Sequence, residues 1–165
     1  MIRVFISIGS NLGSRYLNIL NSIQIINSKI NITIVSQSPI YESNAMYNLN
    51  QNRFLNIVLE LKTNIRPIKL LSLFKEIEQD MGRKITNIRN QPRIIDIDIL
   101  DYDKMIYCDR NLTLPHPLIF ERLFVLKPWS DISPEFKLPN MNTNIMELME
   151  KIDSSNQIIN LYNHS

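Results

Sequence analysis

The order of the apolar segments along the chain constrains its fold more than any other feature of the sequence. Residues 2–8 alternate between apolar and other side chains, as a strand with one buried face does. Residues 32–41 and 54–61 are rich in β-branched and apolar side chains, and residues 94–100 form a fourth apolar run. These four segments predict four strands.

Two predicted helices separate these strands. The first follows Ser14, and its predicted apolar face consists of Leu17, Leu20, Ile23 and Ile26. The second begins at Pro67, a favourable first helical residue, and ends near Met81, because Gly82 is a typical helix stop. The order β-α-β-β-α-β predicts an α+β fold with a ferredoxin-like core, in which two helices pack on one face of an antiparallel sheet.

The rest of the chain predicts short C-terminal additions. A hairpin-like stretch covers residues 101–114, short helices lie near residues 119–126 and 143–152, and a polar tail follows. A chain of 165 residues suits one domain, so we expect residues 1–165 to form a single domain.

Composition excludes several classes of protein. The formal net charge is only +2, which argues against a general nucleic-acid binder. Cys108 is the lone cysteine, so an internal disulfide and a cysteine-based zinc site are excluded. No apolar run reaches the length of a membrane span, and the first residues lack a signal peptide's apolar region. We expect a cytoplasmic monomer that binds neither nucleic acid nor membranes.

Asp96 and Asp98 form the most informative local pattern. On a strand, side chains two residues apart project from the same face, so both carboxylates should lie together. Mg²⁺ prefers oxygen ligands and is often held by one or two carboxylates plus substrate phosphates. The pattern therefore favours a magnesium site on a central strand. The alternative is an exposed edge strand with acidic side chains that prevent aggregation.

Basic residues surround this acidic pair in the sequence. Arg83, Arg89, Arg93 and Arg122 are suited to binding a polyphosphate, although each alone is more often a solvated surface charge. His116 lies between two prolines, which suits it to a fixed hydrogen bond, although a lone histidine is more often structural. The turn at residues 9–13 lacks the lysine and spacing of a Walker loop.

Several motifs follow one another in a recognisable order. They are Gly9-Ser10-Asn11-Leu12-Gly13, Phe54-Leu55-Asn56, Met81-Gly82-Arg83, Pro92-Arg93-Ile94-Ile95-Asp96-Ile97-Asp98, Leu114-Pro115-His116-Pro117 and Arg122-Leu123-Phe124. In order and spacing they resemble the 6-hydroxymethyl-7,8-dihydropterin pyrophosphokinase family, over about residues 2–139. The aspartate block followed by Leu-Pro-His-Pro is the most specific part of this resemblance.

The resemblance implies an enzyme of folate biosynthesis. That family transfers the pyrophosphoryl group of ATP to the hydroxymethyl oxygen of 6-hydroxymethyl-7,8-dihydropterin and releases AMP. The implied cofactor is a pair of Mg²⁺ ions bound together with ATP, and the implied partners are these two small-molecule substrates.

The resemblance also implies a role for individual residues. The implied catalytic residues are Arg83, Arg93, Asp96 and Asp98, and the two aspartates would bind the metal. The implied ATP-binding residues are Glu78, Arg83, Arg93, Ile99, Thr113, His116 and Arg122. The implied pterin-binding residues are Ser43, Phe54, Asn56 and Phe124, with the pterin ring between the two phenylalanines. Without the resemblance, Phe54 and Phe124 would be interpreted as core residues.

Some segments depart from the family pattern. Residues 42–47 lack the proline-containing sequence usual there, and Asn90-Gln91 replace an expected Trp-Gly or similar pair. A binding protein without catalysis is therefore one alternative. An RNA-binding module is the other, but no strand has its aromatic K/R-G-[FY]-x-[FY] pattern. The polar, basic loop from Arg83 to Arg93 is predicted to be the most mobile internal segment.

Overall fold

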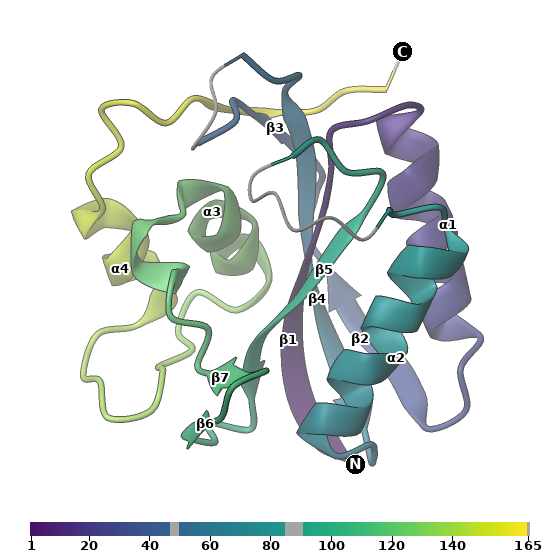
Figure 1. Cartoon of the computed structure of the whole chain (residues 1–165). Coiled ribbons are helices and arrows are strands. Elements are labelled where there is room, and N and C mark those ends of the chain that lie inside the picture. Colours follow the sequence, from purple (N-terminus) through teal and green to yellow (C-terminus); the bar gives the residue numbers. More distant parts are fainter. Residues whose placement is uncertain (47–49, 85–90, 165) are drawn as a thin grey trace.

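An antiparallel sheet runs through the middle of the molecule and carries helices on both faces (Figure 1). The computed structural model describes residues 1–46, 50–84 and 91–164. Its elements are β1 (Ile2–Ser10), α1 (Arg15–Asn27), β2 (Ile32–Gln37), β3 (Tyr41–Ser43), β4 (Phe54–Thr63), α2 (Pro67–Asp80), β5 (Asp96–Tyr102), β6 (Tyr107–Cys108), β7 (Thr113–Leu114), the 3₁₀ helix η1 (Ile119–Glu121), α3 (Leu123–Ile132), α4 (Ile145–Lys151) and β8 (Ile159–Leu161).

The sheet has a ferredoxin-like core. β1 pairs with β4 on one side and with β5 on the other. β2 and β3 follow one another along the second side of β4. All of these pairings are antiparallel, and β5, β1, β4 and β2 arise from a β-α-β-β-α-β order. The predicted α+β fold is therefore confirmed.

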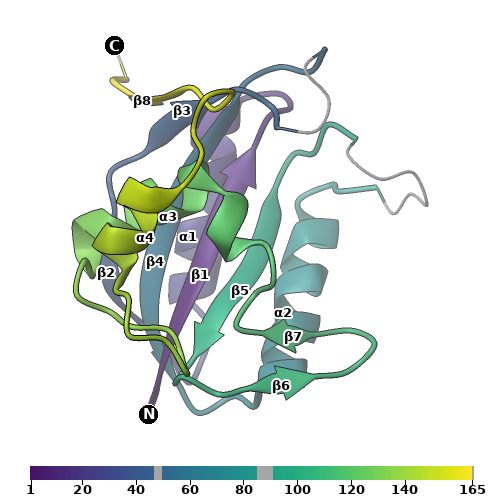
Figure 2. The same cartoon turned by 90° about the vertical axis from the view of Figure 1, so that its left-hand side faces the viewer.

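Helices lie on both faces of the sheet (Figure 2), and each face has its own apolar layer. On one face, Ile6 packs in a cluster with Ile19 of α1 and Phe74 of α2. On the other face, the ring centroid of Phe5 lies 4.8 Å from that of Trp129 on α3. The C-terminal additions thus cover the face that the two predicted helices leave open, and β4 is buried along most of its length.

The predicted apolar face of α1 is wrong for two of its residues. Leu17 and Leu20 are 54% and 40% exposed, whereas Ile26 is buried and Ile23 packs against the core, as predicted. Ile19 and Ser22, which were not predicted, are also buried. The helix carries two apolar stripes at helical spacing, and the stripe with Ile19 and Ile26 is the one that packs on the sheet.

The segment predicted as one strand over residues 32–41 forms two strands, β2 and β3. Between them, Ser38 Oγ accepts a hydrogen bond from Val58 N at 3.0 Å, and Pro39 has no N–H to donate to a ladder. The chain pairs with β4 again further along. This second pairing places β3 beside the first residues of β4.

The two edges of the sheet also differ from expectation. β5 forms one edge of the main sheet, so the prediction that Asp96 and Asp98 lie on a central strand is wrong. β8 forms the other edge by pairing with β3, within the segment predicted to be a polar tail.

None of the helices in the described ranges is long and apolar enough to span a membrane.

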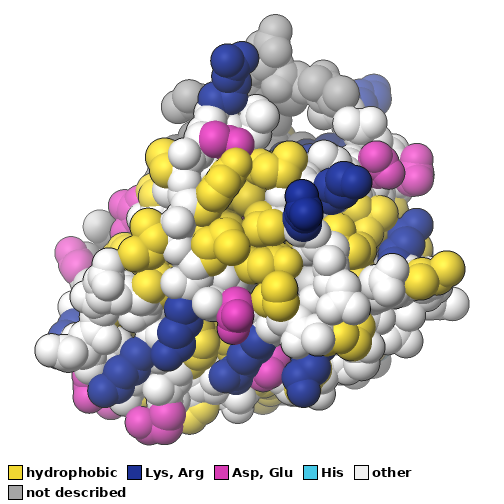
Figure 3. All heavy atoms as spheres, turned by 90° about the horizontal axis from the view of Figure 1, so that it is seen from below, with side chains coloured by type: hydrophobic (Ala, Val, Ile, Leu, Met, Phe, Trp, Pro, Cys, Tyr) yellow, Lys and Arg dark blue, Asp and Glu magenta, His cyan; other side chains and the backbone are white. Residues whose placement is uncertain are grey.

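The end of the molecule where β1 starts is apolar at its centre. Figure 3 shows hydrophobic side chains gathered on this face, with Lys and Arg side chains around them. Met1, Ile2 and Ile106 are exposed hydrophobic residues of the segments at this end. β1 runs away from it towards Ser10, so the turn at residues 9–13 lies at the opposite end of the sheet.

Asp101 is a buried carboxyl group on β5, with 1% of its surface exposed. Its Oδ2 accepts a hydrogen bond from Lys104 N at 3.0 Å, while its Oδ1 has no hydrogen-bond partner among the described residues. Burial raises the pKa of Asp101 to about 6. Because the pKa is raised in the folded state, the protonated carboxyl favours folding. This contribution to stability is complete below the ordinary pKa of 3.8 and is lost as the pH rises through about 6.

We expect Asp101→Asn to increase the free energy of unfolding at pH 7 by up to about 3 kcal/mol, because each pKa unit corresponds to about 1.4 kcal/mol. The difference should shrink as the pH falls from about 6 to about 4, where the wild-type carboxyl becomes protonated. Urea unfolding followed by circular dichroism at several pH values measures this. Asp80→Asn, at an exposed position on α2, is the matched control. An Asp101 variant no more stable than wild type at pH 7 contradicts the prediction.

Candidate active site

A cavity opens near the end of β1 and the start of β5, and many of the predicted site residues line it. They are Ser43, Phe54, Asn56, Arg93, Asp96, Asp98, Arg122 and Phe124. These residues come from β3, β4, β5, α3 and the segments next to them. The fold thus brings together side chains that lie up to about eighty positions apart in the sequence.

Asp96 and Asp98 lie on the same face of β5. In the pairing with β1, Asp96 is opposite Gly9 and Asp98 is opposite Ser7, and all four residues line the cavity. Ile97, between them, packs in the apolar layer on the other face. The predicted common orientation of the two carboxylates is therefore confirmed.

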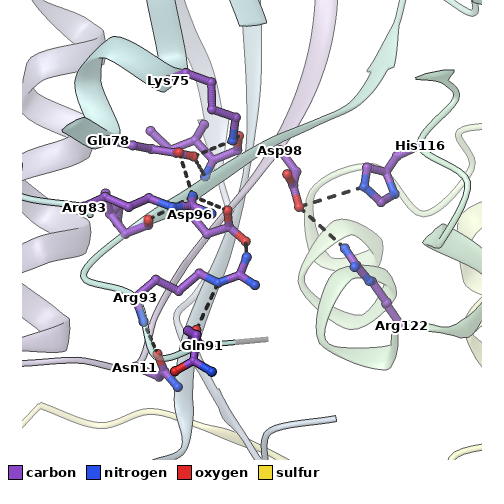
Figure 4. Close-up of polar contacts among 12 residues, drawn as sticks. Asn11, Lys75, Glu78, Arg83, Gln91, Arg93, Asp96, Asp98, His116 and Arg122 are labelled. Atoms are coloured by element: carbon purple, nitrogen blue, oxygen red, sulfur yellow. Dashed lines mark hydrogen bonds and ion pairs between the residues drawn. The ribbon is translucent and has the colours of Figure 1, made fainter. Parts of the chain in front are cut away.

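Asp96 is bound by two arginines (Figure 4). Its Oδ1 lies 2.5 Å from Arg83 Nη1, and its Oδ2 accepts a hydrogen bond from Arg93 Nη1. Burial raises the pKa of Asp96, but the positive charges of Arg93 and Arg83 outweigh burial and hold the pKa below its ordinary value. Asp96 is therefore ionised at neutral pH.

Glu78 holds Arg83 in place from the buried end of α2. Its carboxylate accepts hydrogen bonds from Lys75 Nζ at 2.8 Å and from Ile97 N at 2.7 Å, and lies 2.6 Å from Arg83 Nη1. Burial raises the pKa of Glu78, while Lys75 lowers it. Gly82 ends α2 as predicted, with φ at +95°, and so directs the chain back towards this carboxylate.

Asp98 faces a second pair of basic side chains. Arg122 Nη1 lies 3.5 Å and His116 Nε2 lies 3.9 Å from Asp98 Oδ2. His116 Nδ1 accepts a hydrogen bond from Leu118 N at 3.2 Å, and its own backbone N–H donates to Leu100 O at 2.8 Å. Burial lowers the pKa of His116, which favours the neutral ring. Because Nδ1 accepts a hydrogen bond, the hydrogen of the neutral ring lies on Nε2, on the side of Asp98.

The turn at residues 9–13 positions Arg93. Asn11 N donates to Arg93 O at 3.1 Å, and Asn11 Oδ1 accepts from Arg93 N at 2.8 Å.

Asn11 was not predicted as a site residue, although it lies inside a quoted motif. Lys75 was also missed, and its spacing of three residues from Glu78 on a helix was the available signal.

An apolar part of the cavity, here called the slot, adjoins the charged groups. Phe54 and Phe124 line the same cavity, with Asn56, whose Nδ2 donates to Ser43 Oγ at 2.9 Å. Gly9 lies close to this slot, since a Cβ there would be 3.3 Å from Asn56 Oδ1 and 3.7 Å from Phe54 Cδ1. A side chain at position 9 would therefore fit only if Asn56 moved slightly.

Five predicted nucleotide-binding residues are absent from the lining of this cavity within the described ranges: Glu78, Arg83, Ile99, Thr113 and His116. Arg83 and His116 still adjoin it, because they lie against Asp96 and Asp98. The Ile99 side chain packs in the core, and Thr113 belongs to the short strand β7. Arg89 and most of the loop predicted to be mobile fall on residues 85–90, outside the described residues.

The donor set of the acidic pair fits magnesium. Asp96 and Asp98 offer carboxylate oxygens on one cavity wall, which suits a hard cation. Across the described residues, no cluster of three or more His, Cys, Asp or Glu could hold a metal alone. Arg122 Nε is also buried with no hydrogen-bond partner in the part of the chain described. A bound polyphosphate could supply the missing metal ligands and an acceptor for Arg122.

A protein-family model supports this interpretation of the site. The model described as 7,8-dihydro-6-hydroxymethylpterin-pyrophosphokinase (HPPK) matches residues 5–134. The chain belongs to this family. The resemblance predicted from the motifs is therefore confirmed.

Curated relatives agree with this assignment. A protein of Bacillus subtilis named 2-amino-4-hydroxy-6-hydroxymethyldihydropteridine pyrophosphokinase is 35% identical over 128 residues, which are 78% of this chain and 76% of that protein. The folic acid synthesis protein FOL1 of Dictyostelium discoideum is 44% identical over 147 residues, 88% of this chain. The matched part of the chain spans about a fifth of the length of this protein and of the folic acid synthesis proteins fol1 of Schizosaccharomyces pombe and Pneumocystis carinii.

A solved structure shares the fold. The HPPK-DHPS protein of Plasmodium falciparum, crystallised with pteroate, superposes with a TM-score of 0.73 at 18% identity. The match covers 91% of this chain and 42% of that chain. At this level of identity the likeness supports the HPPK fold, and the assignment of the family rests on the sequence.

Glu78→Gln tests the buried charge cluster. Gln keeps one acceptor oxygen but presents an NH₂ group to a cationic neighbour, so we expect the free energy of unfolding to fall by about 2–4 kcal/mol. Glu76→Gln, on the exposed side of the same helix, should change it by less than about 0.5 kcal/mol. Urea unfolding of both variants measures the two free energies of unfolding. If the two variants were equally stable, the charge cluster would not stabilise the fold.

Proposed function

We propose that this chain transfers the pyrophosphoryl group of ATP to 6-hydroxymethyl-7,8-dihydropterin. The hydroxymethyl oxygen attacks the β-phosphorus of ATP, and the bond from that phosphorus to the oxygen bridging to the α-phosphate breaks. AMP leaves with that oxygen, the hydroxymethyl proton passes to solvent, and the pterin keeps the β- and γ-phosphates.

One observation supports this proposal: charged side chains suited to a polyanion and an apolar slot with two phenylalanines share one cavity. Arg93, Asp96, Asp98 and Arg122 line its charged part, and Phe54, Asn56 and Phe124 line its apolar part. A planar heterocycle between two aromatic rings would stack on both faces, and the Asn56 amide would orient it. Such a ligand would carry its hydroxymethyl group towards the phosphates.

The arginines have a dual role in this proposal. Arg83 and Arg93 neutralise Asp96 in the structure described above. When ATP binds, we expect them to contact phosphate oxygens and stabilise the charge that develops during transfer. His116 donates its Nε2 hydrogen, and Arg122 offers its unpaired Nε, to the same phosphates.

Magnesium completes the proposed site. Asp96 and Asp98 would hold two Mg²⁺ ions together with ATP, as the resemblance implies, and the bound ions would neutralise phosphate charge. Glu78, Ile99 and Thr113 would contact the nucleotide only by backbone groups or after rearrangement, because their side chains lie away from the cavity. We also propose that residues 1–165 act as one domain and as a cytoplasmic monomer.

Release of AMP tests the function. The chain is incubated with ATP, Mg²⁺ and the reduced pterin, and the nucleotides are separated by chromatography. We expect AMP and the pterin diphosphate in equal amounts, and no AMP without the pterin. Binding of both substrates without AMP would identify a non-catalytic binding protein and overturn the proposal.

Arg93→Ala should lower kcat by about 10²-fold or more, because its contact strengthens in the transition state. The Kd for ATP should change much less. Arg110→Ala, at an exposed position between β6 and β7, is the control for removing one positive charge. Wild-type kcat in Arg93→Ala would exclude a catalytic role, and equal losses in kcat and ATP binding would make Arg93 a simple clamp.

Gly9→Ala should raise the KM for the pterin about tenfold, because the new methyl group would press on Asn56. The KM for ATP should stay within about twofold, since the tight contact would be with Asn56 and not with an arginine or an aspartate. Steady-state kinetics with each substrate varied in turn measure both values. Ser72→Ala, exposed on α2, serves as the control, and an unchanged KM for the pterin would remove Gly9 from the slot.

A further inference from the structure

The C-terminal segment crosses between two walls of the cavity. We define residues 156–161 as the C-terminal brace. It follows α4, passes η1 and α3, and ends as β8 beside β3 (Figures 1 and 2). One wall is the segment 43–46, which carries Ser43, and the other is the start of α3, which carries Phe124.

The brace binds the first wall mainly through Asn44. Asn44 Nδ2 donates to Asn156 O at 3.0 Å, and Asn44 Oδ1 accepts from Ile158 N at 2.8 Å. Asn44 N also donates to Ile158 O at 3.3 Å. Next to these bonds, Ser43 pairs with Ile159 in the sheet. The wall contains no proline that would restrict its backbone, so its position depends on these contacts together with the pairing of Ser43 and Phe54.

The brace binds the second wall through Gln157. Gln157 Oε1 accepts a hydrogen bond from Leu123 N at 2.9 Å, and Nε2 donates to Glu121 O at 3.0 Å. Leu123 is the first residue of α3, and the residue before it makes no side-chain cap. Gln157 therefore supplies the cap that α3 lacks, one residue before Phe124.

Little free space remains between the brace and the walls. The cavity bounded by Ser43, Met46, Phe124 and Gln157 measures about 10 Å³, about the space that a single water molecule needs. A shift of the brace would therefore move both walls. Gln157 lies outside the main cavity, so it touches no part of a ligand there.

We infer that the C-terminal brace fixes the separation of the two walls and so sets the affinity of the slot for the flat heterocycle, with Gln157 as the main positioning residue. This inference rests on the proposed function, because the pterin is the ligand that it concerns. It assigns the brace no direct part in binding ATP, since none of the brace contacts named above is with an arginine side chain or the acidic pair.

Gln157→Leu tests the inference, because it removes the hydrogen bonds and keeps the approximate size of the side chain. We expect the KM for the reduced pterin to rise about tenfold, while kcat at saturating pterin and the Kd for ATP stay within about twofold. Gln157→Glu keeps an acceptor for Leu123 N but loses the donor to Glu121 O, so it should recover part of the loss. Asn160→Ala is the control, since its exposed side chain takes part in none of the bonds described here.

A direct binding measurement accompanies the kinetics. Fluorescence titration with oxidised 6-hydroxymethylpterin, in the presence of Mg²⁺ and α,β-methylene-ATP, should give weaker binding for Gln157→Leu and wild-type binding for Asn160→Ala. Hydrogen exchange should be faster at residues 121–124 in Gln157→Leu.

Three outcomes would overturn the inference. An unchanged pterin KM in Gln157→Leu refutes the brace alone when the wild type is active. Equal losses for pterin and ATP, or no recovery in Gln157→Glu, indicate a general structural role instead. A wild type that releases no AMP and binds no pterin overturns the proposed function, and the role of the brace in substrate binding falls with it.

Discussion

The contact of one guanidinium group with two carboxylates underlies the charged half of the site. Arg83 Nη1 lies 2.6 Å from Glu78 and 2.5 Å from Asp96, so it joins the end of α2 to the start of β5. Glu78 is almost fully buried, and removing its cationic partners would leave an uncompensated charge in the core. The stability of the α2–β5 packing and the position of the acidic pair therefore depend on the same interaction.

The features that could be predicted from the sequence are mostly local ones. The common face of Asp96 and Asp98 follows from the two-residue period of a strand, which holds wherever the strand lies in the sheet. The end of α2 at Gly82 follows from the left-handed conformation that glycine adopts easily. The order of strands and helices, with the quoted motifs, was enough to predict the ferredoxin-like core and the family.

The features that were missed or wrong depend on tertiary contacts. The two stripes of α1 have equal helical spacing, so only packing decides that Ile19 is buried and Leu17 exposed. β8 pairs through its backbone with β3 from the other end of the chain, and its residues have no clear strand pattern. The partners of Glu78 come from α2, β5 and the segment after Gly82, and no spacing rule connects these three positions.

His116 differs from the arginines around it in what it contributes. The hydrogen bond from Leu118 N to its Nδ1 orients the ring, and the bond from its backbone N–H to Leu100 O holds the main chain that carries it. The ring therefore offers one hydrogen in one direction and no net charge, while each guanidinium carries a permanent charge on a flexible chain. The cluster combines long-range attraction, which responds only to the charge of a ligand, with one short-range contact that responds to its shape.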